Sequence, residues 1–167
     1  MSSKLTRALL PHMRARRSGH ILNFSSIGGY QSYVGWGVYC ATKFAVEGIS
    51  EALSLELAPL GIYATVVEPG FFRTDFLDAK SLLTAKNSIS DYAETVGVMR
   101  SFAEGHNHQQ PNDPAKLAPA ILELVNSKNP PVRLPLGRDT IEAIEKKNAS
   151  VAKELAEWRR LAESTSF

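Results

Sequence analysis

The feature that most constrains the fold is an order of elements: a short strand, a long helix and a second strand. Residues 21–24 are a short apolar stretch followed by two serines and two glycines, a pattern typical of a buried strand that opens into a loop. Residues 38–57 show helical spacing, Pro59 and Gly61 end this helix, and residues 63–67 again indicate a buried strand. Such a crossover predicts a parallel sheet, whose ligands bind beyond the carboxyl ends of the strands.

The long helix has an amphipathic pattern. Apolar residues recur at helical spacing, and acidic residues lie between them. We expect the apolar side chains to face the sheet, namely Phe44, Ile49, Leu53 and Leu57. We expect the acidic side chains to face water, namely Glu47, Glu51 and Glu56.

Tyr39 and Lys43 are four residues apart on this helix and therefore share one face. A phenol has a pKa near 10, so acid/base work near pH 7 requires roughly 4 kcal/mol of preference for the anion. One ammonium about 5 Å away supplies roughly 3 kcal/mol in a closed cleft and less than about 1 kcal/mol in bulk water. By spacing alone, a half-buried helix tyrosine beside a surface lysine is the simpler interpretation.

Two further segments are expected at the same edge of the sheet. Ser26 follows the first strand, and the dipeptide Pro69-Gly70 follows the second. A Pro-Gly dipeptide also suits an ordinary turn at the end of a strand. The convergence of both segments with Tyr39 favours a functional site.

These residues resemble three motifs of the short-chain dehydrogenases/reductases in their single-domain form. The motifs are residues 23–29 with the serine pair, residues 39–43 with Tyr-x-x-x-Lys, and residues 69–74 from Pro-Gly to threonine, in the order and at the spacing of the family. The resemblance is strong from Leu5 to Phe76 and looser afterwards. It implies an α/β fold with a doubly wound, Rossmann-like parallel sheet.

The resemblance also implies roles for these residues. Ser26 is expected to hold the substrate oxygen, Tyr39 to act as general acid/base, and Lys43 to contact the ribose of a nicotinamide cofactor. The cofactor, NAD or NADP, is expected to contact Tyr39, Lys43, Pro69, Gly70, Phe72 and Thr74. A small hydrophobic carbonyl compound or its alcohol is expected to contact Ser26, Tyr33, Trp36, Phe71 and Phe76.

Compared with the family, the amino-terminal half of the domain is not found in this sequence. The glycine-rich phosphate loop is missing, as are the residue that selects NAD or NADP and the helix asparagine of the catalytic set. We therefore expect the incomplete, carboxyl-terminal part of one Rossmann domain, with impaired cofactor binding. Within residues 1–167, we expect a catalytic core at 1–70, a substrate lid at 71–112, and terminal helices with an edge strand at 113–167.

In the terminal region, residues 132–137 read as a proline-tolerant edge strand, and Asp139 fits a capping pattern for the helix that follows. Leu155, Trp158 and Leu161 fall on one side of the last helix. We expect this side to pack on the same subunit or on a dimer mate, and a partner-binding helix is the alternative.

Composition and charge exclude other classes of protein. The net charge of +2 argues against an electrostatic nucleic-acid or membrane role. The opening helix is too short and interrupted to span a membrane, and one cysteine without a signal peptide favours the cytoplasm. Cys40 is expected to be a small packing residue, and the four histidines lack the context of metal ligands. The complete family form is expected to be a homodimer or homotetramer.

Two other functions fit the same motifs. A fragment or interaction module could keep these residues without catalysis, and titration with nicotinamide nucleotides separates it from an enzyme. An epimerase or dehydratase of the wider family also uses Tyr-x-x-x-Lys. The Pro-Gly-to-threonine pattern at residues 69–74 and the short terminal region make this second alternative less favoured.

Overall fold

The computed structural model describes residues 2–85 and 87–167. Its centre is a three-stranded parallel sheet in the order β1-β2-β3, formed by β1 (Gly19–Phe24), β2 (Ile62–Pro69) and β3 (Arg133–Leu136). In register, Gly19 pairs with Ile62 and Phe24 with Val67, while Val66 pairs with Arg133. The predicted α/β class with a parallel, Rossmann-like sheet is confirmed, and β3 is the predicted proline-containing edge strand.

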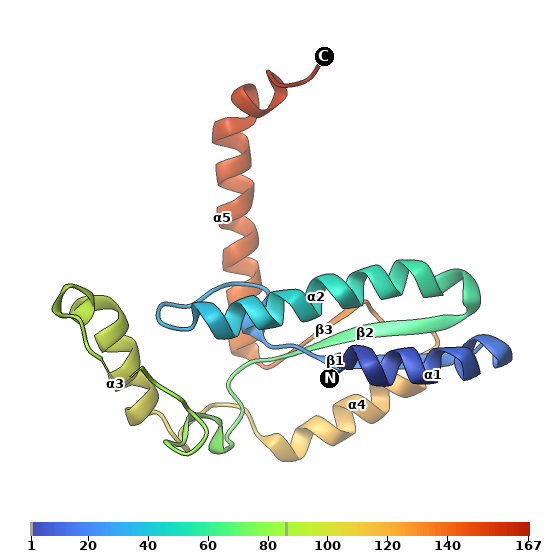
Figure 1. The fold of residues 1–167 in the computed structure, drawn as a ribbon, viewed down its shortest axis with the longest axis horizontal. Helices are drawn as coiled ribbons and strands as arrows, with labels where there is room; N and C mark the ends of the chain where they lie inside the picture. The colour runs from blue at the N-terminus through green and yellow to red at the C-terminus, as the bar shows by residue number, and fades with distance from the viewer. Residues whose placement is uncertain (1, 86) are drawn as a thin grey trace.

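Five α-helices are described around the sheet: α1 (Ser2–Arg16), α2 (Gly37–Leu57), α3 (Val98–Gly105), α4 (Leu117–Asn126) and α5 (Arg138–Glu163). Helices α2 and α4 lie on opposite sides of the strands (Figure 1). The core includes Ile21, Leu57, Ile62 and Ala64, with Leu10, Met13, Leu53 and Leu60 packed against it. Between β2 and α4, the described residues form short helical turns and α3 instead of further strands.

The orientation of α2 follows the sequence expectation at Leu57, which is buried, and at Glu51 and Glu56, which are exposed, but differs from it elsewhere. Phe44 and Ile49 are 45% and 54% exposed, whereas Glu47, expected in water, is only 6% exposed. The buried positions of the helix are Cys40, Glu47, Ser50 and Leu57. The buried polar positions have partners far along the chain: Ser50 Oγ accepts a hydrogen bond of 2.8 Å from Asn23 on β1, and Glu47 lies 3.4 Å from Arg133 on β3.

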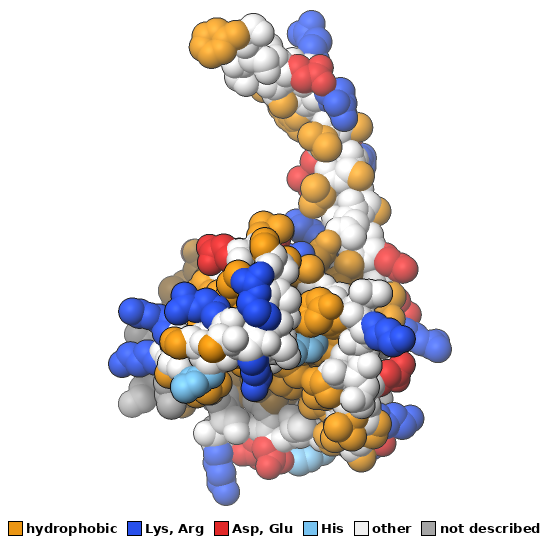
Figure 2. Space-filling model, turned by 90° about the vertical axis from the view of Figure 1, so that its right-hand side faces the viewer, with side chains coloured by type: hydrophobic (Ala, Val, Ile, Leu, Met, Phe, Trp, Pro, Cys, Tyr) orange, Lys and Arg blue, Asp and Glu red, His pale blue; other side chains and the backbone are white. Residues whose placement is uncertain are grey.

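Helix α5 projects from the body, with the carboxyl terminus at its tip (Figure 1). Its outer half carries exposed apolar side chains, which Figure 2 shows along the projecting arm. They are Val151, Leu155, Trp158 and Leu161. The expectation that this side packs on the same subunit is therefore wrong for the described residues.

The expected cap of α5 is also wrong. The N-cap position is Gly137, and no side chain caps the helix. Instead, the Asp139 carboxylate accepts hydrogen bonds from the main chain of Phe71 and from Asn112.

Candidate active site

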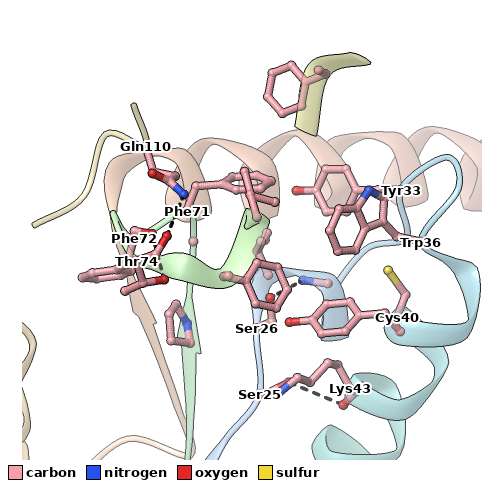
Figure 3. Close-up of a pocket in the computed structure, with 18 of the residues that line it drawn as sticks. Ser25, Ser26, Tyr33, Trp36, Cys40, Lys43, Phe71, Phe72, Thr74 and Gln110 are labelled. Atoms are coloured by element: carbon pink, nitrogen blue, oxygen red, sulfur yellow. Dashed lines mark hydrogen bonds between the residues drawn. The ribbon is translucent and has the colours of Figure 1, made fainter. Parts of the chain in front are cut away.

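A cavity of about 420 Å³ opens at the carboxyl ends of β1 and β2, beside the first turns of α2 (Figure 3). Its walls come from the loop after β1, from α2, from the turn after β2 and from the segment that leads into α4. The predicted catalytic, cofactor and substrate residues all line it: Ser26, Tyr33, Trp36, Tyr39, Lys43, Pro69, Gly70, Phe71, Phe72, Thr74 and Phe76. The topology thus brings the three motifs together, although they lie up to about 50 residues apart in the sequence.

The two serines after β1 have different environments. Ser26 is the N-cap of a short 3₁₀ helix, Ile27–Gly29, and its Oγ accepts a hydrogen bond of 3.1 Å from the Gly28 N–H. This bond leaves the hydroxyl proton of Ser26 available for donation, to the Tyr39 oxygen or to a ligand in the cavity. Ser25 is buried, and its Oγ donates to the Lys43 carbonyl at 3.4 Å.

Tyr39 and Lys43 share one face of α2, as their spacing predicts. The Lys43 Nζ lies 5.7 Å from the centre of the Tyr39 ring and donates a hydrogen bond of 3.2 Å to the Phe24 carbonyl. Burial raises the pKa of the Tyr39 phenol, although a hydrogen bond with Ser26 opposes this rise. Burial also lowers the pKa of Lys43, and the negative charge of Glu47 opposes that change. In this structure, the phenol therefore favours its protonated form.

Aromatic rings form much of the cavity wall. Trp36 stacks on Phe76 with ring centres 5.7 Å apart, and each of these rings also contacts Tyr39. Phe71 makes edge contacts with Tyr33 and Phe102 at 6.5 and 6.3 Å. The walls suit an apolar ligand, while Ser26, Tyr39 and Lys43 contribute polar groups to the lining.

The turn after β2 is held by a clamp that sequence reasoning missed. The Asp139 Oδ2 accepts from the Phe71 N–H at 2.8 Å, and its Oδ1 accepts from the Asn112 Nδ2 at 2.8 Å. Asn112 Nδ2 also donates to the Phe71 carbonyl at 3.0 Å. A Cβ at Gly70 would collide with the Asp139 carboxylate, so the closeness of the clamp requires glycine there.

Other cavity residues lay outside the predicted site. They include Met99, Phe102, Gln110 and Leu117, which come from α3, from the segment after it and from the start of α4. Gln110 is 3% exposed and donates from Nε2 to the Thr74 carbonyl at 3.2 Å. No local pattern distinguishes these residues from ordinary core or loop positions, so only the fold assigns them to the cavity.

Known proteins support the relationship that the motifs suggested. A family model described as short chain dehydrogenase matches residues 2–82. A 3-ketodihydrosphingosine reductase of Bacteroides thetaiotaomicron is 41% identical over 80% of this chain and 49% of its own length. A short-chain dehydrogenase structure from Streptomyces avermitilis is 43% identical, with a TM-score of 0.87 over 99% of this chain and 59% of that chain. The structure of ElxO with NADP bound is 25% identical, with a TM-score of 0.60 over 84% of this chain and 54% of that chain.

The fold and these relatives define a Rossmann-like α/β protein of the short-chain dehydrogenase class. The chain belongs to the short-chain dehydrogenase/reductase family. It spans about half the length of the curated relatives it matches. Among the described residues, no helix is both long and apolar enough to cross a membrane.

Proposed function

We propose that this chain carries the catalytic part of an NAD(P)-dependent oxidoreductase that interconverts a hydrophobic carbonyl compound and its alcohol. The observation that supports this best is that Ser26, Tyr39 and Lys43 line one and the same cavity, whose walls are largely aromatic. The relative named 3-ketodihydrosphingosine reductase supports a keto substrate class. In this proposal, residues 1–70 form the catalytic core, residues 71–112 cover the substrate, and residues 113–167 complete the sheet and support the turn after β2.

The residues present fit a nicotinamide group. The Lys43 ammonium lies within the cavity wall near the Tyr39 ring, where it can donate hydrogen bonds to ribose hydroxyls. The clamped turn at Pro69-Gly70 lines the cavity, as do Phe72 and Thr74. Together they offer a surface on which the flat, partly apolar nicotinamide ring can lie. The NADP in the ElxO structure supports the same cofactor class for this fold. Bound at this place, the cofactor supplies or accepts a hydride.

The chain's own residues handle the oxygen and its proton. Ser26 Oγ donates a hydrogen bond to the substrate oxygen and stabilises the negative charge that develops there during reduction. Tyr39 gives its phenolic proton to that oxygen, which completes the alcohol. The aromatic wall of Trp36 and Phe76 orients the apolar part of the substrate and excludes water.

The protonated state of Tyr39 favours the reductive direction. Burial raises the phenol's pKa, so at neutral pH the residue holds the proton that an alkoxide needs. Oxidation requires the phenolate instead, and the Lys43 ammonium is the group that stabilises it from within this chain. We therefore infer that reduction is the faster direction near neutral pH.

The test compares Tyr39→Phe with Tyr92→Phe as the matched control. Tyr92 is exposed and does not line the cavity, so its replacement removes a hydroxyl without touching the site. With NADH or NADPH and an aryl ketone, we expect Tyr39→Phe to lower kcat/KM by at least about 10²-fold, the usual contribution of a positioned acid. The control should keep the parent rate.

The same experiment separates an enzyme from a non-catalytic module. Nucleotide binding is followed in parallel by nicotinamide fluorescence. Saturable binding with turnover in the parent chain supports the enzyme, whereas flat titrations and no turnover support the module. Unchanged turnover in Tyr39→Phe contradicts the assignment of the acid.

A further inference from the structure

Two carboxylates are buried directly behind the candidate active site. Glu68 is fully buried on β2, one residue before Pro69. Glu47 is 6% exposed on α2, one helical turn beyond Lys43. The pair thus lies between the helix that carries Tyr39 and the strand that leads into the Pro-Gly turn.

The surroundings leave these carboxylates short of partners. The Arg133 Nε lies 3.4 Å from a Glu47 oxygen and 3.7 Å from a Glu68 oxygen. The Nη2 of the same guanidinium donates at 2.6 Å to the exposed Glu51. Apart from the contact between the two carboxylates themselves, none of their four oxygens accepts a hydrogen bond within the described part of the chain. One guanidinium is therefore divided among three carboxylates.

The other groups that face the pair do not supply the missing charge. On α2, Lys43 acts on Glu47 from one turn away, but its ammonium is bonded to the Phe24 carbonyl. From the loop after β1, Tyr30 lines a smaller cavity of about 320 Å³ together with Glu47, Glu51 and Arg133. Two buried carboxylates cannot both stay ionised beside so little positive charge.

A retained proton resolves this conflict. Burial, the charge of Glu47 and a hydrogen bond with Glu47 together raise the pKa of Glu68 to about 8, against the opposing effect of Arg133. With one proton between them, a carboxylic acid can donate to the neighbouring carboxylate, which makes a short, strong hydrogen bond. The contact would then join α2 to β2.

Glu47 also contacts the loop that carries Ser26. A Cβ built on Gly29 would lie 3.0 Å from both the Cγ and the Oε1 of Glu47. The glutamate side chain therefore packs closely against the 3₁₀ helix that Ser26 caps. The pair therefore contacts the elements that carry all three motifs: the loop after β1, helix α2 and strand β2.

We propose that Glu47 and Glu68 are positioning residues that share one proton, and that this hydrogen bond holds α2 against the strand ending at Pro69-Gly70. The inference rests on the proposed function, because the groups held in place are those assigned to catalysis there. Release of the proton leaves two negative carboxylates side by side. Their repulsion loosens the helix from the strand.

Cys40 offers a readout that needs neither cofactor nor substrate. It is the only cysteine of the chain, is 2% exposed and lines the cavity between Tyr39 and Lys43. The experiment measures the labelling rate of Cys40 by a neutral thiol reagent from pH 6 to pH 8. Each rate is divided by that of the same chain unfolded in urea at the same pH, so that ionisation of the thiol cancels.

If opening of the helix releases the shared proton, the corrected rate should rise by roughly tenfold per pH unit over this range. Glu68→Gln keeps the shape and supplies a permanent N–H donor to Glu47, so its corrected rate should stay low and nearly flat. Glu47→Gln should flatten the profile in the same way. Glu51→Gln is the matched control, because it removes a carboxylate from the same helix and the same arginine, and it should keep the parent slope.

A flat profile in the parent chain, or an unchanged slope in Glu68→Gln, overturns the proposal. If the pair had a purely structural role, Glu68→Gln would instead be labelled faster than the parent chain at every pH and would keep the parent slope. If the labelling result fails while Tyr39→Phe still abolishes turnover, the function stands and the shared proton is rejected. If the labelling result holds without any turnover, the proton link stands and the proposed reaction is rejected.

Discussion

Asp139 should be a main determinant of the shape of the active-site turn. Its carboxylate accepts two hydrogen bonds of 2.8 Å, from the Phe71 N–H and from Asn112 Nδ2. Replacement by alanine removes both: the Phe71 N–H loses its acceptor, and Asn112 Nδ2 keeps only its bond to the Phe71 carbonyl. Bonds to a charged acceptor are worth about 1.5–3 kcal/mol each, and partial access of water reduces the sum, so we expect a loss of about 2–4 kcal/mol in the free energy of unfolding.

Urea denaturation measures this loss. With an m-value of about 2 kcal/mol/M, the midpoint should fall by about 1–2 M for Asp139→Ala. Glu142→Ala, an exposed acidic position on the same helix, is the control and should change stability by less than about 0.5 kcal/mol.

Asp139→Asn sharpens the test. The asparagine oxygen can still accept from the Phe71 N–H, but its amide nitrogen then faces the Asn112 Nδ2, which is fixed by its bond to the Phe71 carbonyl. We expect a loss of about 1–2 kcal/mol, smaller than that of the alanine variant. If Asp139→Ala is as stable as the parent chain, the clamp does not hold the turn and the reasoning is refuted.

Two further predictions concern stability. Gly61 has a φ of +69°, and a Cβ there would lie 2.7 Å from the Arg17 carbonyl oxygen, so Gly61→Ala should lower the melting temperature by roughly 4–8 °C, for a loss of about 2 kcal/mol. Gly48→Ala, on α2 with open space around the position, is the control and should leave stability equal or raise it by up to about 1 kcal/mol; equal melting temperatures for the two variants would contradict the prediction. The second concerns pH: Glu68 has a pKa of about 8 in the fold against 4.5 ordinarily, so the folded state keeps a proton that the unfolded chain releases, and stability should fall as pH rises from about 4.5 to 8. At about 1.4 kcal/mol per pH unit the loss is at most about 5 kcal/mol, and urea denaturation at several pH values should show a weaker slope in Glu68→Gln; a matching slope in both would count against the buried proton.

The sequence predicted the fold, and the meeting of its three motifs at one edge of the sheet, because these signals are local. Each strand is a short apolar stretch that ends in a recognisable segment, the serines after β1 and Pro69-Gly70 after β2. Parallel pairing then sends both ends to one edge of the sheet, whatever the details of packing. Tyr39 reaches the same edge because α2 begins beside it.

The supports of the site could not be predicted in this way. Glu47 is separated by 21 residues from Glu68 and by 86 residues from Arg133, and only the fold makes them neighbours. The helical pattern placed Glu47 in water because acidic side chains rarely face a core, and that rule fails where a buried partner exists. Asp139 was assigned to a helix cap for a similar reason, since its partners Phe71 and Asn112 are distant in the chain.

The structure also changes the electrostatic argument for Tyr39. The spacing suggested that a nearby ammonium would supply most of the roughly 4 kcal/mol needed for a phenolate near neutral pH. In the fold, burial disfavours both charged forms, because it raises the pKa of Tyr39 and lowers that of Lys43. The lysine charge is also partly engaged by the Phe24 carbonyl at 3.2 Å. The hydrogen bond from Ser26 to Tyr39 and the charge of Glu47 near Lys43 oppose this desolvation without exceeding it, so the pair donates a proton more readily than it accepts one. A phenolate suited to alcohol oxidation requires additional positive charge at the mouth of this cavity, whereas ketone reduction can use the residues as they stand.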